Sequence, residues 1–158
     1  MSDDLQKQQD LGKPPPRWVL KLFTRINVWV YQLSKGKLMN KLGDDPICLI
    51  TMKGAKTGRS RTIPLMYVPD GDAFLLVASQ GGAPKNPVWY YNLVAHPDIT
   101  IEHDGTRHPL TARIVQGEEK ASLWPVCDQH YADYAIYRQR TTRDIPLFRC
   151  EPRASSNS

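Results

Sequence analysis

Hydrophobic and polar positions follow two different periods along this chain, and the change of period separates its predicted elements. Between Arg17 and Gly36 apolar residues recur every three or four positions, which predicts an amphipathic helix. From Ile47 onward, short apolar runs rich in β-branched residues alternate with turn residues, which predicts strands. Residues 1–16 are polar and end in three prolines. We expect them to form a mobile arm.

Turn residues divide the remainder into short elements. Asp70-Gly71 and Asp104-Gly105 each predict a hairpin, because both dipeptides tolerate the positive φ of a tight turn. The predicted elements are strand 47–52, hairpin strands 63–68 and 73–78, helix 88–95, hairpin strands 98–103 and 106–115, a helix from 118 that continues to 137, and strand 145–150. Five or six mostly antiparallel strands with peripheral helices indicate an α+β domain built on a small β-barrel. We expect one domain over residues 17–152, followed by a short tail.

Charge and cysteine content narrow the class of protein. The net charge is +5, yet residues 13–41 alone carry seven cations and no acid. The cations and tryptophans of the predicted N-terminal helix suit packing on the core, and they also suit an anionic membrane surface.

The three cysteines are odd in number and lack CxxC spacing, which favours a reducing compartment. Without a secretory signal or an apolar run of roughly 20 residues, we expect a cytoplasmic protein that meets membranes only peripherally.

The loop that follows the first predicted strand concentrates positive charge. Its nine residues 53–61 contain four cations, two glycines and no acid; the cations are Lys53, Lys56, Arg59 and Arg61. Glycines let a backbone approach a ligand closely, and free N–H groups with cations suit an anion. The spacing is not that of a P-loop, because strands follow rather than a helix. We therefore predict an anion site here.

Three further groups could carry chemistry. They are the small residues 78–82 at a predicted strand end, the successive aromatics Trp89, Tyr90 and Tyr91, and the phenols Tyr131, Tyr134 and Tyr137 at helical spacing. Three adjacent aromatics cannot all face a core, so at least one should face a cleft or solvent. The three phenols should share one helical face. His103 and His108 flank a turn without a third ligand, so no metal site is expected.

The motifs G-A-K-T-G-R-S-R-T-I-P-L, A-S-Q-G-G-A-P-K-N-P-V-W-Y-Y-N-L-V-A-H-P and I-P-L-F-R-C-E-P resemble those of the deazaflavin-dependent nitroreductases of actinobacteria. The resemblance covers roughly residues 17–152. It implies a split β-barrel, similar to FMN-binding barrels, that binds coenzyme F420. It further implies an oxidoreductase that transfers hydride from the reduced cofactor to quinone or nitro acceptors.

The resemblance also implies roles for individual positions. The cofactor phosphate and tail would lie at Ala55, Lys56 and Thr57. The deazaflavin would be lined by Arg61, Thr62, Ile63, Pro64, Leu65 and Met66, by Val77, Ala78, Ser79 and Gln80, and by Val88, Trp89, Tyr90, Tyr91 and Asn92. Tyr134 would close over it, and the catalytic groups Tyr131, Tyr137 and Ser79 would face the acceptor. Two positions depart from the family pattern, since Ala55 replaces a basic residue and Gln80 a frequent lysine.

Three alternatives stay open at this point. A split barrel that uses FMN would also need a cationic loop for its phosphate. A nucleic-acid-binding barrel would use the positive charge and the aromatics, although Trp89 and its neighbours are predicted on a helix rather than on the strand surface where bases stack. A third candidate is a carrier that binds the cofactor without catalysis. Titration of the protein with deazaflavin and FMN separates the FMN-dependent barrel from the deazaflavin-dependent one.

Overall fold

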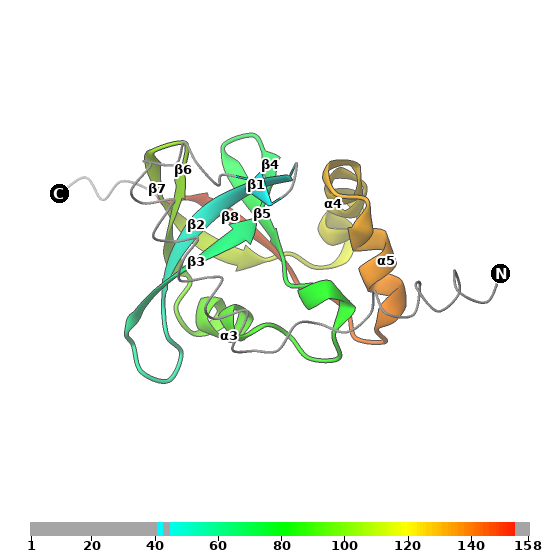
Figure 1. The fold of residues 1–158 in the computed structure, drawn as a ribbon, viewed down its shortest axis with the longest axis horizontal. Coiled ribbons are helices and arrows are strands. Elements are labelled where there is room, and N and C mark those ends of the chain that lie inside the picture. The colour runs from blue at the N-terminus through cyan, green and yellow to red at the C-terminus, as the bar shows by residue number, and fades with distance from the viewer. Residues whose placement is uncertain (1–40, 43–44, 154–158) are drawn as a thin grey trace, which may run out of the picture.

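A computed structural model describes residues 41–42 and 45–153 of the chain (Figure 1). The predicted mobile arm, the predicted N-terminal helix and residues 154–158 of the tail lie outside the described residues. The domain boundaries and the membrane-facing helix therefore stay predictions.

Eight strands form one antiparallel sheet in the described part of the chain. They are β1 (Lys41–Leu42), β2 (Asp45–Lys53), β3 (Ser60–Met66), β4 (Val68–Asp70), β5 (Ala73–Val77), β6 (Asp98–His103), β7 (Thr106–Ile114) and β8 (Leu147–Pro152). Their order is β1-β2-β6-β7-β8-β5-β4, and β3 pairs with β2. The two edge strands β3 and β4 are separated along the chain by Tyr67 alone. The sheet must therefore curl until its edges approach each other, which produces a half-open barrel (Figure 1).

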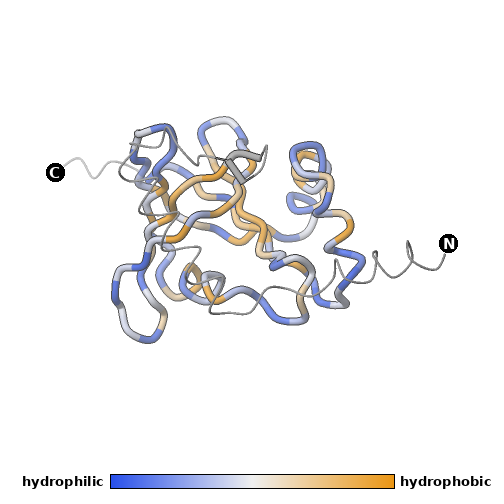
Figure 2. The backbone as a smooth tube through the Cα atoms, in the orientation of Figure 1, coloured by the Kyte–Doolittle hydropathy of each residue, from blue (hydrophilic) through white to orange (hydrophobic). Residues whose placement is uncertain are grey.

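The helices cover the curled sheet in two places. Helix α3 (Val88–Ala95) contributes Trp89 and Leu93 to the larger buried cluster, where they join alternate residues of the strands. Helices α4 (Gly117–His130) and α5 (Asp133–Arg140) cover a second cluster that includes Leu75 and Val77. Figure 2 shows the hydrophobic positions running along the strands, with hydrophilic colour at the hairpin tips. The expected α+β fold with a small antiparallel barrel and peripheral helices is confirmed.

One predicted hairpin has the wrong partner. Residues 63–66 were expected to pair with 73–78, whereas β3 pairs along its whole length with β2, from Ser60 opposite Lys53 to Met66 opposite Ile47. Only the short β4 pairs with β5 across the Asp70-Gly71 turn. The reason is that the glycine loop before β3 is itself a hairpin turn. Pro64, which has no N–H to donate, is accommodated because β3 lies at the edge of the sheet.

The predicted helix from Glu118 to Tyr137 is also wrong, because it is two helices. Tyr131 ends α4 with an extended backbone, φ −147° and ψ 100°, and α5 begins two residues later. The three phenols therefore do not share one helical face. A smaller difference concerns the last strand, which starts at Leu147 instead of Ile145.

Candidate active site

The cationic loop is the tip of the β2–β3 hairpin, and its backbone is largely occupied with its own bonds. The N–H of Gly54 donates to Arg59 O at 2.8 Å, and that of Gly58 to Gly54 O at 2.8 Å. The N–H of Arg59 donates to the Thr57 hydroxyl at 3.2 Å, and that of Ala55 to Asn92 Oδ1 at 2.9 Å. The sequence predicted that an anion would bind to the loop N–H groups. Only those of Lys56 and Thr57 remain free for it.

The other groups of this loop that could meet an anion are its cationic side chains. Lys53, Lys56, Arg59 and Arg61 form no ion pair within residues 45–153, although other cations of the domain do. Arg113, for example, contacts both Glu119 and Glu151 at 2.8 Å. Four neighbouring cations that form no ion pair with the described residues repel one another and favour a multiply charged anion.

Asn92 connects this loop to α3. Its side chain is 8% exposed; Oδ1 accepts from Ala55, and Nδ2 donates to Met52 Sδ at 3.5 Å. Two of the groups that the resemblance assigns to one site, the loop and the start of α3, are thus in direct contact. Nothing in the local sequence pattern predicted that Asn92 would bond to the loop backbone.

The implied residues of β3 divide between two faces. Successive side chains alternate across a strand. The register with β2 places Arg61, Ile63 and Leu65 on the face that looks toward the larger cluster and α3. Thr62, Pro64 and Met66 lie on the opposite face, where the Thr62 hydroxyl bonds to that of Thr51 at 2.9 Å. Arg61, Ile63 and Leu65 can therefore contact a ligand on the α3 side with their side chains. Thr62, Pro64 and Met66 could contact it only through backbone atoms.

The end of β5 is held by a residue that the sequence did not indicate. Val77 and Ala78 are buried, Gln80 is exposed, and Ser79 is 7% exposed. Arg143 donates to the carbonyl oxygens of both Ala78, at 3.1 Å, and Ser79, at 2.8 Å. Since backbone carbonyls carry no residue-specific signature, no pattern could have revealed this contact.

The aromatic residues of α3 are exposed to different extents, as expected. Trp89 is buried against Phe148, Tyr90 is half-buried, and Tyr91 is 51% exposed. Val88 is exposed as well. The prediction that one of the three successive aromatics faces outward is confirmed.

The three tyrosines still meet although they come from separate elements. The hydroxyls of Tyr131 and Tyr137 lie 3.0 Å apart, and the ring of Tyr134 packs against the other two. Tyr134 is buried, whereas Tyr131 and Tyr137 are half-buried. Burial raises the pKa of the Tyr131 phenol, and its hydrogen bond with Tyr137 raises that pKa further. The Tyr131 hydroxyl is therefore protonated at neutral pH and can donate a hydrogen bond.

The segment after β5 links these tyrosines to α3. The short 3-10 turn η2 (Gln80–Gly82) packs on α5, and Gly82 lies so close that an added Cβ would be 2.7 Å from Tyr137 O. Figure 1 shows the chain passing from this turn to α3. The loop, α3, the strand end and the phenols thus form a continuous series of neighbouring groups.

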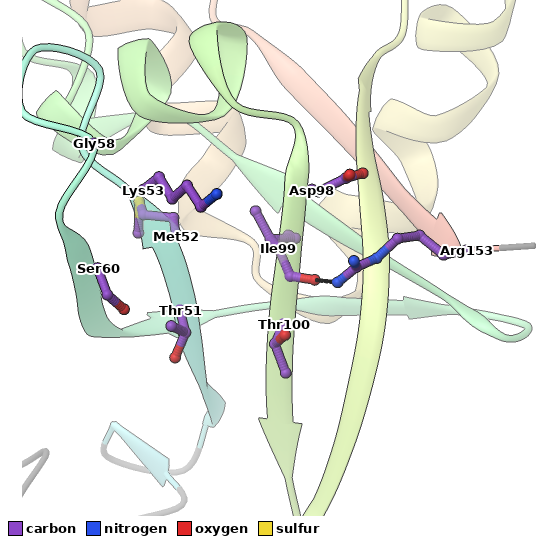
Figure 3. A pocket seen from close by; sticks show the side chains of 9 residues that line it. All are labelled: Thr51, Met52, Lys53, Gly58, Ser60, Asp98, Ile99, Thr100 and Arg153. Carbon is purple, nitrogen blue, oxygen red and sulfur yellow. Dashed lines mark hydrogen bonds between the residues drawn. The ribbon is translucent and has the colours of Figure 1, made fainter. Parts of the chain in front are cut away.

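A pocket of about 360 Å³ lies between the cationic loop and β6 (Figure 3). It is lined by Thr51, Met52, Lys53, Gly58, Ser60, Asp98, Ile99, Thr100 and Arg153. None of the residues that the resemblance implies for cofactor or acceptor lines it. Arg153 is fixed there by its bond to Ile99 O at 3.0 Å, drawn as a dashed line in Figure 3.

The described part of the chain contains neither a metal-binding cluster nor an ionised cysteine thiol. Cys48, Cys127 and Cys150 are buried and free. Burial raises the pKa of Cys48 to about 12, so its thiol is not ionised at neutral pH. Residues 45–153 contain no cluster of three metal-binding side chains, and His103 is bonded to Tyr67. Nor does this part contain a helix long and apolar enough to cross a membrane.

Comparison with known proteins decides the family. The sequence model of the F420H(2)-dependent quinone reductases matches residues 23–152. The chain belongs to this family. An F420H(2)-dependent quinone reductase of Mycobacterium tuberculosis H37Rv is 39% identical over 127 residues, which are 78% of this chain and 85% of the relative. The expected family and its cofactor, coenzyme F420, are thereby confirmed.

Solved structures agree with this assignment. The chain of an F420-H2 dependent reductase, FDR-A, is 41% identical and superposes with a TM-score of 0.63, covering 67% of this chain and 94% of that one. A domain-swapped dimer is 38% identical with a TM-score of 0.64, covering 78% and 97%. The heme storage protein HutZ of Vibrio cholerae, at 12% identity and a TM-score of 0.52, shares the fold alone, covering 72% and 85%.

Proposed function

We propose that this protein reduces quinones with a hydride from reduced coenzyme F420. The observation that carries the proposal is the cationic loop, whose four cations have no acidic partner among residues 45–153 while Asn92 fixes the loop against α3. Bound F420 supplies the hydride chemistry itself. The protein then has to bind an anionic cofactor, orient it and donate to the acceptor.

The donor set fits this cofactor. A phosphate needs cations and a few N–H groups, and the loop offers Lys56, Arg61 and the N–H groups of Lys56 and Thr57. Ala55 adds no charge at the position where the family has a basic residue, but Lys53 and Arg59 are close by in the same loop. We infer that the loop binds the phosphate and tail, and that the inward face of β3, the end of β5 and the start of α3 hold the ring.

The acceptor end would be formed by hydroxyl groups. Addition of a hydride to a quinone places negative charge on an oxygen atom, and a positioned phenol stabilises such a charge by donating to it. The neutral Tyr131 phenol shares a hydrogen bond with the Tyr137 hydroxyl, so one of the two can donate outward while the other supports it. Ser79 supplies a further hydroxyl at the end of β5. Nitro compounds develop similar charge on oxygen and are a second predicted acceptor class.

An anaerobic assay tests the proposal. Purified protein should oxidise reduced F420 when a soluble quinone is added, and it should bind F420 more tightly than FMN. The double substitution Lys56→Ala and Arg61→Ala should weaken F420 binding roughly 10- to 100-fold, and raised salt should weaken it in the wild type. Arg107→Ala, which removes an exposed cation from β7, is the matched control and should bind normally. FMN binding with no F420 binding would refute the assignment.

Peripheral contact with anionic membrane belongs to the same proposal, since many quinones are dissolved in membranes. It is supported by the seven cations of residues 13–41 and by Trp18 and Trp29 in the predicted helix. Sedimentation with anionic vesicles, with and without residues 1–35, tests it. Equal pelleting of both forms, with the truncated form folded, would exclude the contact.

A further inference from the structure

Arg143, in the connection between α5 and β8, is bonded to one segment by four hydrogen bonds. In addition to the carbonyls of Ala78 and Ser79, it donates from Nε to Ala83 O at 2.8 Å and from Nη1 to Asn86 Oδ1 at 2.6 Å. All four acceptors lie between the end of β5 and the start of α3. One planar guanidinium therefore sets the path of the chain from the strand to the helix, and lysine cannot reproduce that geometry.

Arg143 forms no ion pair with a carboxylate among residues 47–153. By contrast, Arg138 is paired with Asp128 at 2.6 Å, and Arg149 with Asp70 at 3.0 Å. Arg143 is half-buried, and this desolvation lowers its pKa. Burying a cation among neutral oxygen atoms costs desolvation free energy that no ion pair offsets. This cost indicates that the conformation of the segment itself is important.

Apart from the bonds of Arg143, few hydrogen bonds join this segment to the rest of the described chain, although η2 packs on α5. At its first residue, Ala78 donates to Pro146 O at 2.9 Å, and the bond from Arg140 to Gly81 O is 3.4 Å long. Within it, Gly82 donates to Ser79 O at 2.9 Å, and Gln80 adopts a φ of +46°. The Ser79 side chain is mostly buried and makes no hydrogen bond to the described residues, yet its hydroxyl is not fully enclosed, because no fully buried polar side-chain atom of these residues lacks a partner. Its hydroxyl is therefore available to a ligand.

We propose that Arg143 is a positioning residue that holds the 78–86 segment so that the Ser79 hydroxyl meets the cofactor or acceptor. This inference rests on the proposed function, because Ser79 is one of the groups assigned to that site. Arg143 itself touches backbone and Asn86 rather than ligand, and it acts through Ser79. Loss of the guanidinium should leave the fold intact while the hydroxyl loses its fixed position.

The first measurement needs no activity. Hydrogen exchange of the unliganded protein is compared in wild type, Arg143→Lys, Arg143→Gln and the control Arg107→Gln, with thermal unfolding recorded for each. Amides of residues 79–83 should exchange at least about tenfold faster in both Arg143 variants, while β2, β6 and β7 exchange as in the wild type. Unchanged exchange of residues 79–83 in a folded Arg143→Lys protein would overturn the proposal.

The second measurement tests whether Arg143 acts through Ser79. Quinone-dependent oxidation of reduced F420 is measured for Ser79→Ala, Arg143→Lys and the double variant. We expect kcat to fall roughly tenfold in each single variant and hardly further in the double one, because both remove the same placed hydroxyl. Losses that multiply would show that Arg143 is merely structural and would overturn the proposal. An inactive wild type would instead refute the proposed function, and the exchange data would still show whether Arg143 holds the segment.

Discussion

The side-chain oxygen of Asn92 accepts a hydrogen bond from the backbone N–H of Ala55 at 2.9 Å, although 37 residues separate the two. This bond, made by a buried side chain, connects the start of the cationic loop to α3. Because the same side chain also donates to Met52, its orientation is fixed. The side-chain amide of Asn92 therefore fixes the position of the cationic loop relative to α3.

Substitutions of Asn92 separate the geometry of the loop from its charge. Asn92→Leu removes the acceptor and leaves the Ala55 N–H without its partner, so it should lower the free energy of unfolding by about 1–3 kcal/mol. It should also weaken F420 binding. Asn92→Asp retains an oxygen for Ala55 but places negative charge beside the loop, so it should weaken binding mainly at low salt.

Titration of both variants with F420 at low and high ionic strength provides the measurement. The Asn92→Asp protein should approach the wild type as salt rises, while the Asn92→Leu protein should stay weaker at every salt concentration. Identical salt curves for the two variants would mean that the bond to Ala55 does not govern the loop.

Local turn chemistry made much of the fold predictable from the sequence. Asp70-Gly71 and Asp104-Gly105 do form turns with positive φ, 63° at Gly71 and 48° at Asp104. Helix α3 begins and ends where expected, because Pro87 and Pro97 limit it. The basic loop was recognised from its own residues. In each case the information lies within a few neighbouring positions.

What could not be predicted depends on partners far apart in the chain. The pairing of β5 with β8 joins Leu76 to Phe148, and no local pattern specifies that choice or excludes a longer β3–β5 hairpin. The spacing of Tyr131, Tyr134 and Tyr137 suits one helix, yet Tyr131 has an extended backbone and packs its ring against the second cluster, a tertiary contact that spacing alone does not reveal. Arg143 recognises carbonyl oxygens, which every residue has.

Gly82 is the position where the strand-end segment most closely approaches α5. Its φ is +80°, and an added Cβ would lie 2.7 Å from Tyr137 O and 2.8 Å from Arg140 Cβ. Gly82→Ala should therefore push η2 away from the tyrosines. Gly71→Ala is a matched control, since Gly71 has a similar φ of +63° but no atom within 4 Å of an added Cβ.

We expect Gly71→Ala to cost about 1 kcal/mol from the unfavourable φ alone. Gly82→Ala should cost roughly 1–3 kcal/mol more because of the steric overlap, and it should slow quinone reduction. Denaturant unfolding of both variants measures the difference. Equal losses of stability would show that the segment shifts freely and that its contact with α5 constrains nothing.

The last prediction concerns the hydroxyl pair. The raised pKa of Tyr131 arises first from burial and then from the bond with Tyr137. A phenol whose folded pKa exceeds its ordinary value of about 10 is stabilised by folding in its neutral form. The corresponding contribution to stability is complete below about pH 10 and is lost as pH rises through the folded pKa. The donor should thus stay protonated throughout the range in which the enzyme is assayed.

Phenylalanine at Tyr131 or Tyr137 keeps the ring packing and removes one hydroxyl. If that hydroxyl donates to the acceptor oxygen, quinone-dependent oxidation of reduced F420 should slow by the order of 10²-fold with little change in F420 affinity. Between pH 7 and 9 the wild-type kcat should show no loss caused by ionisation of Tyr131. An alkaline loss in this range that disappears in Tyr131→Phe would contradict the raised pKa. Normal rates in both single variants would make the pair a packing feature, because a true oxyanion donor cannot be removed without a change in kcat.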